Sequence, residues 1–342
     1  MNSTNEKRQV LLVGSVPLAN AAAVFEAVGE TLGELAPRIP DGETGQRTAW
    51  IFCLKPVLAS TANLRKHREF ELAPGFTQIV YEIADRTKPL AFGPLGYAAA
   101  AKASYDDFAR LKKAGRVPKG TKFQVSLPTP LAVLTAFFEP KSQELAEKPL
   151  AAAMINEVNE IARVVPRGEL AIQWDVCHEI LILDGWTGET FFDATKQGMI
   201  GRVAAMGNAT PADIELGFHL CYGDPGHKHL KEPDDLATSV DICNMLFEQV
   251  KRPIAWVHMP VPRGRDDDAY FAPLKNLHLP AGTQLFLGLV HLTGGLEGTR
   301  RRMETAKRVR SDFGIACECG FGRRPPETVH SLLDLHRQAA AI

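Results

Sequence analysis

Residues 213–224 read Asp-Ile-Glu-Leu-Gly-Phe-His-Leu-Cys-Tyr-Gly-Asp, an apolar run that ends in turn-forming sequence from Gly223 onward. Such a run predicts a buried strand that stops near Cys221. Side chains two positions apart on a strand point to the same side, so His219 and Cys221 face one way at the end of this strand. An imidazole and a thiol placed together supply half of a zinc site. The alternative is a buried core histidine beside an inert cysteine.

The alternation of strand and helix extends in both directions from this unit. Eight short strands are predicted, at 10–13, at the start of 37–47, and at 123–128, 170–175, 214–221, 253–258, 284–291 and 314–319. Helical sequence follows them, most clearly at 19–35, 154–162, within 185–206, and at 235–250, 296–313 and 325–340. Eight such units predict a single (β/α)8 barrel, a TIM barrel, over residues 1–342, with residues 1–8 as a polar tail. A doubly wound open sheet is the alternative, but no Gly-x-Gly-x-x-Gly follows any strand.

The longest connection lies between the second and third strands, over about residues 50–119. We expect a helix near 50–64, a hairpin within 76–92 and a helix around 104–114 there. This excursion is expected to cover or wall one end of the barrel.

Composition narrows the class of protein. The chain has 342 residues, 45% hydrophobic and 23% charged, with a net charge of −1. This balance gives no electrostatic footprint for nucleic acid or for an anionic membrane. No apolar leader or membrane-length run is present, so a cytoplasmic location is expected. The six cysteines favour metal binding or burial over a disulfide framework.

Polar and ionisable residues gather where the apolar runs stop. The set is Ser15, Asp41, Glu43, Ser126, Asp175, His219, Cys221, His258, His291, Cys317 and Cys319. In a barrel these strand ends share one face, which is where active sites are built. This convergence is the strongest functional signal in the sequence.

Zinc is the metal that suits the thiols of this set. His219, Cys221 and a cysteine of the last strand would supply three ligands. We prefer Cys319 to Cys317 for the third, because the following glycine lets the backbone turn out of the strand. His258 could be a fourth ligand, could support a ligand, or could do neither.

At these residues the chain resembles the catalytic C-terminal barrel of cobalamin-independent methionine synthase, in the superfamily that includes uroporphyrinogen decarboxylase and thiol alkyltransferases. The similar segments are 13–17 (Val-Gly-Ser-Val-Pro), 41–43 (Asp-Gly-Glu), 172–175 (Ile-Gln-Trp-Asp), 219–221 (His-Leu-Cys) and 319–320 (Cys-Gly). The resemblance implies that Ser15, Glu43 and Asp175 hold an amino-acid-like substrate. It also implies that His219, Cys221 and Cys319 bind zinc and that His291 assists proton transfer.

Three further residues are assigned to substrate binding. Asp41 and Ser126 end strands at the same face, and Arg323, just past the last strand, could hold a carboxylate or phosphate. His227 and His229, after Cys221, either line the mouth or are exposed.

The departures from the family pattern concern both substrates. His258 stands where the family has a glutamate ligand, and Val125 where it has a folate-stacking tryptophan. Folate as donor and homocysteine as acceptor are therefore both open. The donor could instead be another small molecule or a corrinoid protein.

The expected function is zinc-dependent methyl or alkyl transfer to a small thiol or amino-acid-like substrate. Glu43 and Asp175 would fix a cationic end of the acceptor, and His291 would act as general acid or orienting group. One alternative is a hydrolase or lyase that uses metal-activated water. Others are a metal-free, decarboxylase-like barrel and a non-catalytic zinc protein that docks a methyl carrier.

Overall fold

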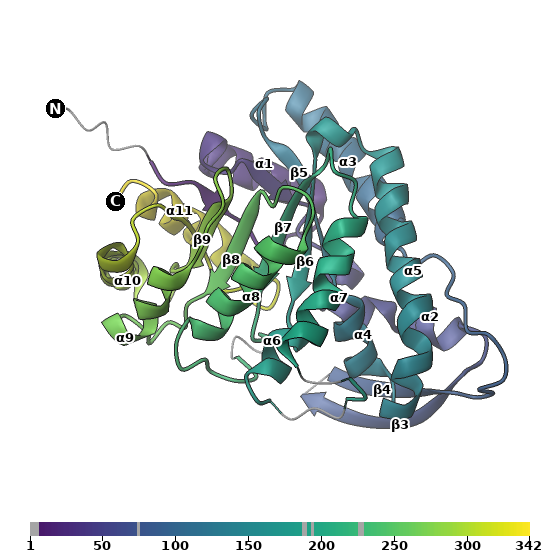
Figure 1. The fold of residues 1–342 in the computed structure, drawn as a ribbon. Helices are drawn as coiled ribbons and strands as arrows, with labels where there is room; N and C mark the ends of the chain where they lie inside the picture. Colours follow the sequence, from purple (N-terminus) through teal and green to yellow (C-terminus); the bar gives the residue numbers. More distant parts are fainter. Residues whose placement is uncertain (1–6, 74–75, 187–189, 193–194, 225–228) are drawn as a thin grey trace.

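Eight parallel strands form a nearly closed ring in the computed structural model, which describes residues 7–73, 76–186, 190–192, 195–224 and 229–342 (Figure 1). Around the ring the order is β1 (Val10–Leu11), β10 (Gly314–Ala316), β9 (Gln284–Gly288), β8 (Trp256–Pro260), β7 (Glu215–Leu220), β6 (Leu170–Val176), β5 (Lys122–Pro128) and β2 (Arg38–Pro40). A parallel bridge between Ser15 and Gly42 joins the segments that follow the two edge strands. The predicted (β/α)8 barrel is therefore confirmed.

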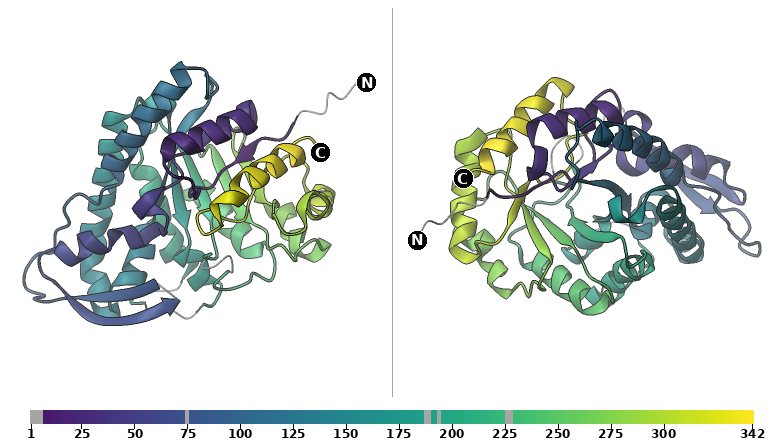
Figure 2. Two further views of the ribbon diagram at one scale, coloured as in Figure 1. Left: turned by 180° about the vertical axis from the view of Figure 1, so that it is seen from behind. Right: turned by 90° about the horizontal axis from the view of Figure 1, so that it is seen from above.

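Helices surround the strands on the outside, as the view from above shows (Figure 2). They are α1 (Ala21–Thr31), α3 (Tyr97–Lys113), α4 (Pro130–Phe137), α5 (Pro140–Val164), α6 (His178–Leu183), α7 (Lys196–Ala209), α8 (Ala237–Gln249), α9 (Asp268–Phe271), α10 (Gly295–Val309) and α11 (Val329–Ala339). The short helix α6 was not predicted separately. Five of its six residues are buried, so it lacks the one-sided pattern that marks a surface helix.

The long excursion between β2 and β5 is present, but its hairpin lies earlier than expected. Its strands are β3 (Leu64–Ala73) and β4 (Phe76–Ile83), preceded by α2 (Lys55–Ser60). The prediction over 76–92 missed β3 because Arg65, Lys66 and Arg68 make that strand polar. Residues 65–71 are all exposed, so this strand outside the barrel carries such side chains in contact with solvent. The hairpin packs against α4, which directly follows β5, and so lies beside the carboxyl ends of the strands.

Polar and apolar layers fill the inside of the barrel. At the amino-terminal ends of the strands, Arg38 bonds Glu215 at 2.6 Å and lies over the ring of Trp256. Trp256 fits because residue 217 is a glycine, whose missing Cβ would overlap the indole. Closer to the carboxyl ends of the strands, the Gln124 and Gln173 amides both donate to the Val13 carbonyl. These contacts fill the amino-terminal half of the barrel and leave its carboxyl-terminal end for the candidate site.

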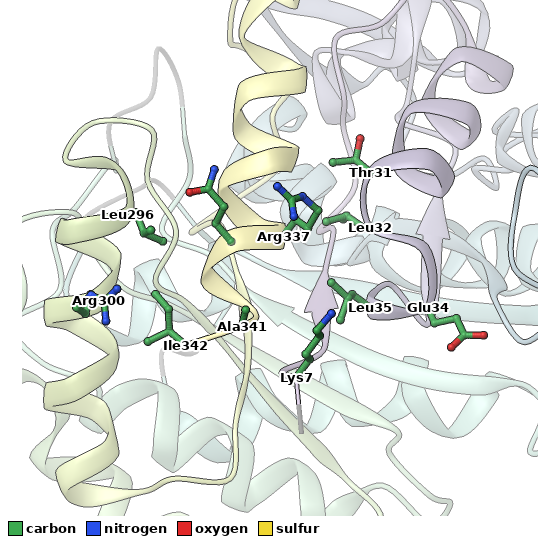
Figure 3. A pocket seen from close by; sticks show the side chains of 11 residues that line it. Lys7, Thr31, Leu32, Glu34, Leu35, Leu296, Arg300, Arg337, Ala341 and Ile342 are labelled. Carbon is green, nitrogen blue, oxygen red and sulfur yellow. The ribbon is translucent and has the colours of Figure 1, made fainter. Parts of the chain in front are cut away.

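A surface groove lies away from the strand ends. A groove of about 700 Å³ runs along the outer wall and is lined by residues of α1, α10, α11 and their neighbours, including Leu32, Arg300 and Arg337 (Figure 3). None of its lining residues belongs to the predicted site. Among the described residues, no helix has both the length and the apolar character needed to cross a membrane.

A candidate metal centre at the barrel mouth

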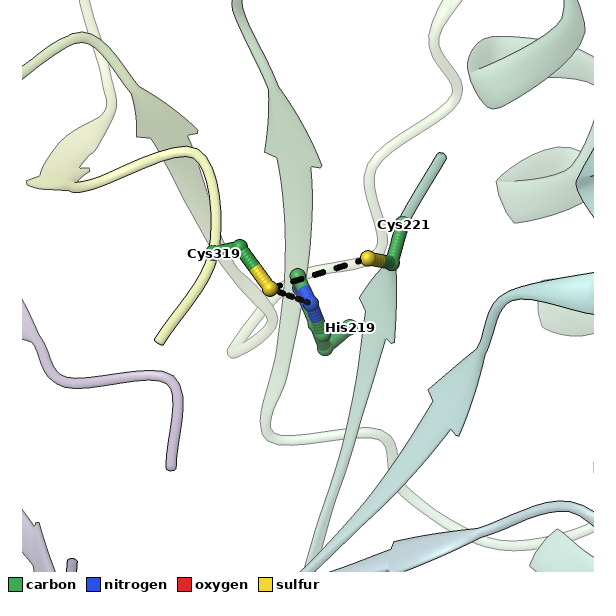
Figure 4. Close-up of side chains that lie close together, drawn as sticks. All are labelled: His219, Cys221 and Cys319. Atoms are coloured by element: carbon green, nitrogen blue, oxygen red, sulfur yellow. Dashed lines mark hydrogen bonds between the residues drawn. The ribbon is translucent and has the colours of Figure 1, made fainter. Parts of the chain in front are cut away.

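Three donor side chains meet at the carboxyl ends of the strands (Figure 4). His219 lies near the end of β7, Cys221 follows that strand, and Cys319 follows β10. Their ligand atoms all lie within 4.8 Å of one another. Strands β7 and β10 are separated by β8 and β9, so the group spans part of the mouth. Segments about one hundred residues apart in the chain thus deliver nitrogen and sulfur to one point.

The spacing of these atoms suits a tetrahedral zinc ion. Cys221 Sγ and Cys319 Sγ are 3.7 Å apart, and Cys319 Sγ lies 3.9 Å from His219 Nε2. Two zinc–sulfur bonds of about 2.3 Å in a tetrahedral site place their sulfurs about 3.8 Å apart. Among the described residues the group supplies three donors, the number that catalytic zinc sites take from protein.

Without an ion the two thiols are poor acids. The neighbouring Cys221 thiol and burial raise the pKa of Cys319 well above its usual value, and contact with Cys177 together with burial does the same for the pKa of Cys221. A bound dication reverses this balance because it stabilises thiolate directly. The Gly223 N–H already donates to Cys221 Sγ at 3.2 Å, and the Arg323 guanidinium lies 3.5 Å from Cys319 Sγ.

Arg323 is oriented by an acidic partner. Its Nε and one terminal nitrogen bond Asp224 Oδ2 at 3.2 and 2.9 Å. This ion pair holds the guanidinium beside Cys319, where its charge favours the thiolate. Arg323, predicted to bind substrate, therefore has protein partners on both sides.

His258 contacts the Nδ1 atom of His219, whereas Cys319 lies near the Nε2 atom of that ring. Its Nδ1 lies 2.7 Å from His219 Nδ1, and its Nε2 donates to the Cys317 carbonyl at 3.0 Å. Both ring nitrogens thus have protein partners, and His258 is not part of the donor group. Burial lowers the pKa of His258 to about 3 and that of His219 well below its usual value, so both rings are neutral at pH 7.

Cys317 and Cys319 separate because β10 ends at Ala316. Beyond that residue the alternation of a strand no longer applies, and Cys317 is buried in the core while Cys319 joins His219. Gly320 is needed here, since a Cβ at that position would overlap the Ser15 hydroxyl. The choice of Cys319 from the following glycine thus identified the cysteine that lies with His219 and Cys221.

Two carboxyl groups, those of Glu43 and Asp175, lie at the carboxyl ends of β2 and β6, at the same mouth of the barrel. Asp175 on β6 pairs in register with His219 on β7, and Gln173 donates to its Oδ1 at 2.9 Å. A Cβ at Gly14 would lie 3.3 Å from the Ser126 hydroxyl and 3.6 Å from the Glu43 carboxyl, so this glycine leaves space between the two side chains. Burial raises the pKa of Glu43 to about 7, and burial together with Glu43 raises the pKa of Asp175 well above its usual value. Such a pair is suited to a cation, which would restore both groups to the charged form.

The other predicted substrate-binding residues are engaged with the protein. Asp41 accepts from Arg47 at 2.5 Å, from Ser104 at 2.8 Å and from the Glu43 backbone N–H at 2.9 Å. It therefore shapes the loop that presents Glu43.

The two serines at strand ends also bond the backbone. The Ser15 hydroxyl accepts from the Gly322 N–H at 3.2 Å, and the Ser126 hydroxyl donates to the Val13 carbonyl at 2.9 Å. Both hydroxyls thereby join the ends of neighbouring segments of the mouth.

His291 belongs to a second group that sequence reasoning found only in part. Its Nε2 donates to the Val261 carbonyl at 2.8 Å, and its Nδ1 lies 3.6 Å from Glu318, whose other oxygen lies 3.5 Å from His229 Nε2. Burial lowers the pKa of His291 to about 3 and raises that of Glu318 to about 8. His229 thus lies against the mouth, while His227 falls outside the described residues. In the sequence, Glu318 could have been found as the acidic residue between Cys317 and Cys319, at the end of a predicted buried strand.

Comparison with solved structures supports the fold. A B12-independent methionine synthase from Shewanella sp. W3-18-1, solved in complex with selenomethionine, matches with a TM-score of 0.62 at 14% identity, over 98% of this chain and 96% of that chain. A methyltransferase from Methanosarcina mazei matches with a TM-score of 0.52 at 12% identity, over 97% and 94%. No protein-family model and no curated protein matches the chain. At these identities the likeness establishes a shared barrel and leaves the activity to be argued from the site.

Proposed function

We propose that this protein binds zinc through His219, Cys221 and Cys319 and transfers a methyl or alkyl group to a small thiol. The observation that carries the proposal is the convergence of one imidazole and two thiols at a barrel mouth that also carries the Asp175 and Glu43 carboxyl groups. When bound, the ion would supply the Lewis acidity that keeps a substrate thiol ionised near neutral pH. The nearly full-length likeness to a methionine synthase and a methyltransferase supports a transferase.

The residues around the donor group would bind the acceptor and stabilise the two protein thiolates. Glu43 and Asp175 would hold a cationic end of the acceptor, because a positive charge stabilises the carboxylate form of both groups. Arg323 and the Gly223 N–H would keep the two protein thiols in the thiolate form through hydrogen bonds. This arrangement fits an aminothiol or a thiol amino acid.

His291 fits an orienting role better than a proton-donating one. Its ring is neutral at pH 7, and its Nε2–H is already donated to the Val261 carbonyl. Its Nδ1 faces Glu318.

In the transfer step the substrate sulfur forms a bond to the alkyl carbon while the bond from that carbon to the donor breaks. The donor would be a small molecule or a corrinoid protein.

Zinc content and sulfur coordination test this proposal. Protein purified without added metal should contain about one zinc per chain, and Cys221→Ser should lose it. Cys317→Ser is the matched control, since that buried thiol lies outside the donor group. Zinc retained in Cys221→Ser, or absent from the unmodified protein, would refute the metal site.

The acceptor is tested by X-ray absorption at the zinc edge with two thiols of similar size. Adding 2-aminoethanethiol should add one sulfur to the coordination shell, and 2-mercaptoethanol should do so only at higher concentration. An unchanged sulfur count with both thiols would point to chemistry of a metal-bound water, as in a hydrolase or lyase. A shell closed by a fourth protein ligand would point to the non-catalytic, carrier-docking alternative.

A further inference from the structure

Two histidines on neighbouring strands are linked in a chain of hydrogen bonds that ends at the candidate metal position. His258 on β8 and His219 on β7 stand at the same register, and their Nδ1 atoms are 2.7 Å apart. On its other side, His258 Nε2 lies 3.0 Å from the Cys317 carbonyl oxygen. His258 is fully buried and His219 is 2% exposed, so water does not compete for these bonds.

The direction of every bond in the chain follows from its outer end. A carbonyl oxygen only accepts, so His258 Nε2 must carry the proton. In a neutral ring the remaining nitrogen, Nδ1, then has the lone pair. It must accept, and the proton between the two rings therefore belongs to His219 Nδ1.

His219 is left with its lone pair on Nε2. That atom lies 3.9 Å from Cys319 Sγ, on the side of the ring where the donor group gathers. The backbone of Cys317 thus sets the tautomer of a side chain on another strand, through His258.

We propose that His258 is a positioning residue that fixes the Nδ1–H tautomer of His219 and thereby aims its Nε2 lone pair at the metal position. This inference rests on the proposed function, because it assigns a role relative to the metal held by His219, Cys221 and Cys319. Partners of this kind orient metal-binding histidines and raise their basicity. Neutral imidazole is an unusual choice for the partner, since a carboxylate or carbonyl is more common.

A neutral partner has a consequence for the charge of the centre. A carboxylate in this place would add a negative charge behind His219, whereas His258 adds none. With two thiolates and neutral imidazoles, the centre keeps a lower negative charge, which leaves a bound cation more able to attract an additional thiolate.

Two variants of His258 test the role. His258→Phe keeps the ring volume but removes both bonds, and His258→Gln can still accept from His219 and donate to Cys317. Zinc affinity, measured by competition with a chromophoric chelator, should fall about 10- to 100-fold in His258→Phe. It should stay near that of the unmodified protein in His258→Gln. His336→Phe, at another fully buried histidine, controls for the general cost of such a change.

A second measurement does not depend on metal. In metal-free protein with ¹⁵N-labelled histidine, the His219 signals, identified by their loss in His219→Ala, should report the Nδ1–H tautomer. An Nε2–H tautomer, or equal zinc affinity in His258→Phe and the unmodified protein, would overturn the inference. So would two imidazoles in the zinc absorption spectrum. Failure of the unmodified protein to bind zinc would instead refute the proposed function, and the tautomer result would still decide whether the relay exists.

Discussion

At the scale of single residues, Glu43 is an acid of the candidate site whose charge changes near neutral pH. Burial raises its pKa to about 7 because the carboxylate loses hydration. We expect the affinity for 2-aminoethanethiol, relative to 2-mercaptoethanol, to rise by up to about tenfold per pH unit between about 5.5 and 7. The rise should level off above pH 7, once Glu43 is ionised. Titrating both thiols against the zinc protein measures this ratio, which cancels the proton released from the thiol itself.

The control for this prediction is Glu43→Gln, which should give a ratio that is low and flat with pH. Stability should respond in the opposite sense. A carboxyl whose folded pKa is raised holds its proton more tightly when folded, so its contribution to stability falls as pH rises from its unfolded value of about 4.5 to about 7. Glu43→Gln should make the fall in the free energy of unfolding with pH shallower, by the part that Glu43 contributes, as measured from urea unfolding curves at several pH values. An unmodified protein with a flat ratio across this range would contradict the cation site.

The candidate site could be predicted at the residue scale where a strand pattern applies. His219 and Cys221 follow from alternation along β7, and the three donors named for zinc besides His258 do lie together. The role of His258 could not be decided from the sequence, because two imidazoles at one register on neighbouring strands face the same side. Only one can reach the thiols, and the contact with the Cys317 carbonyl that decides between them arises from tertiary structure.

At the scale of elements, the fit of β7 against β8 determines where His219 stands. Gly217 on β7 leaves the space that the Trp256 indole fills, and a Cβ there would overlap the ring. We expect Gly217→Ala to lower the free energy of unfolding by at least about 2 kcal/mol, since a fully buried ring cannot move aside without strain. It should also weaken zinc binding, because His219 lies two residues further along the strand.

Urea unfolding and zinc competition measure the two effects. Gly168→Ala is the matched control, because a Cβ at that position meets nothing within 4 Å. It should change neither quantity appreciably. A Gly217→Ala protein as stable as the unmodified one would show that the packing of Trp256 is not needed to hold β7.

The elements themselves were predictable to differing degrees. The barrel strands came from short apolar runs, which is the expected pattern for strands buried on both faces. The hairpin was placed too late because the polar strand β3 lacks such a run, and α6 was hidden because nearly all of it is buried. Helix α5 is far longer than its predicted 154–162, and Pro149 inside it is a residue that usually marks a helix end.

At the scale of the whole molecule, the barrel brings together chain segments that the sequence separates widely. Cys221 and Cys319 follow strands that are not neighbours, and the Ser15–Gly42 bridge closes the ring between the segments that follow β1 and β2. The excursion places the β3–β4 hairpin at this same end.

We therefore expect removal of the metal to lower the stability of the whole barrel. An ion held by Cys221 and Cys319 would tie the ends of β7 and β10 across the mouth and would bind the folded chain far better than the unfolded one. At a free ion concentration about 1,000 times Kd, such binding adds about 4 kcal/mol to stability. We expect a chelator to lower the Tm of the zinc protein by several degrees and to speed amide exchange at the ends of both strands. Cys221→Ser should unfold at the lower temperature with or without chelator. An equal chelator effect in that variant would place the stabilising ion elsewhere in the molecule.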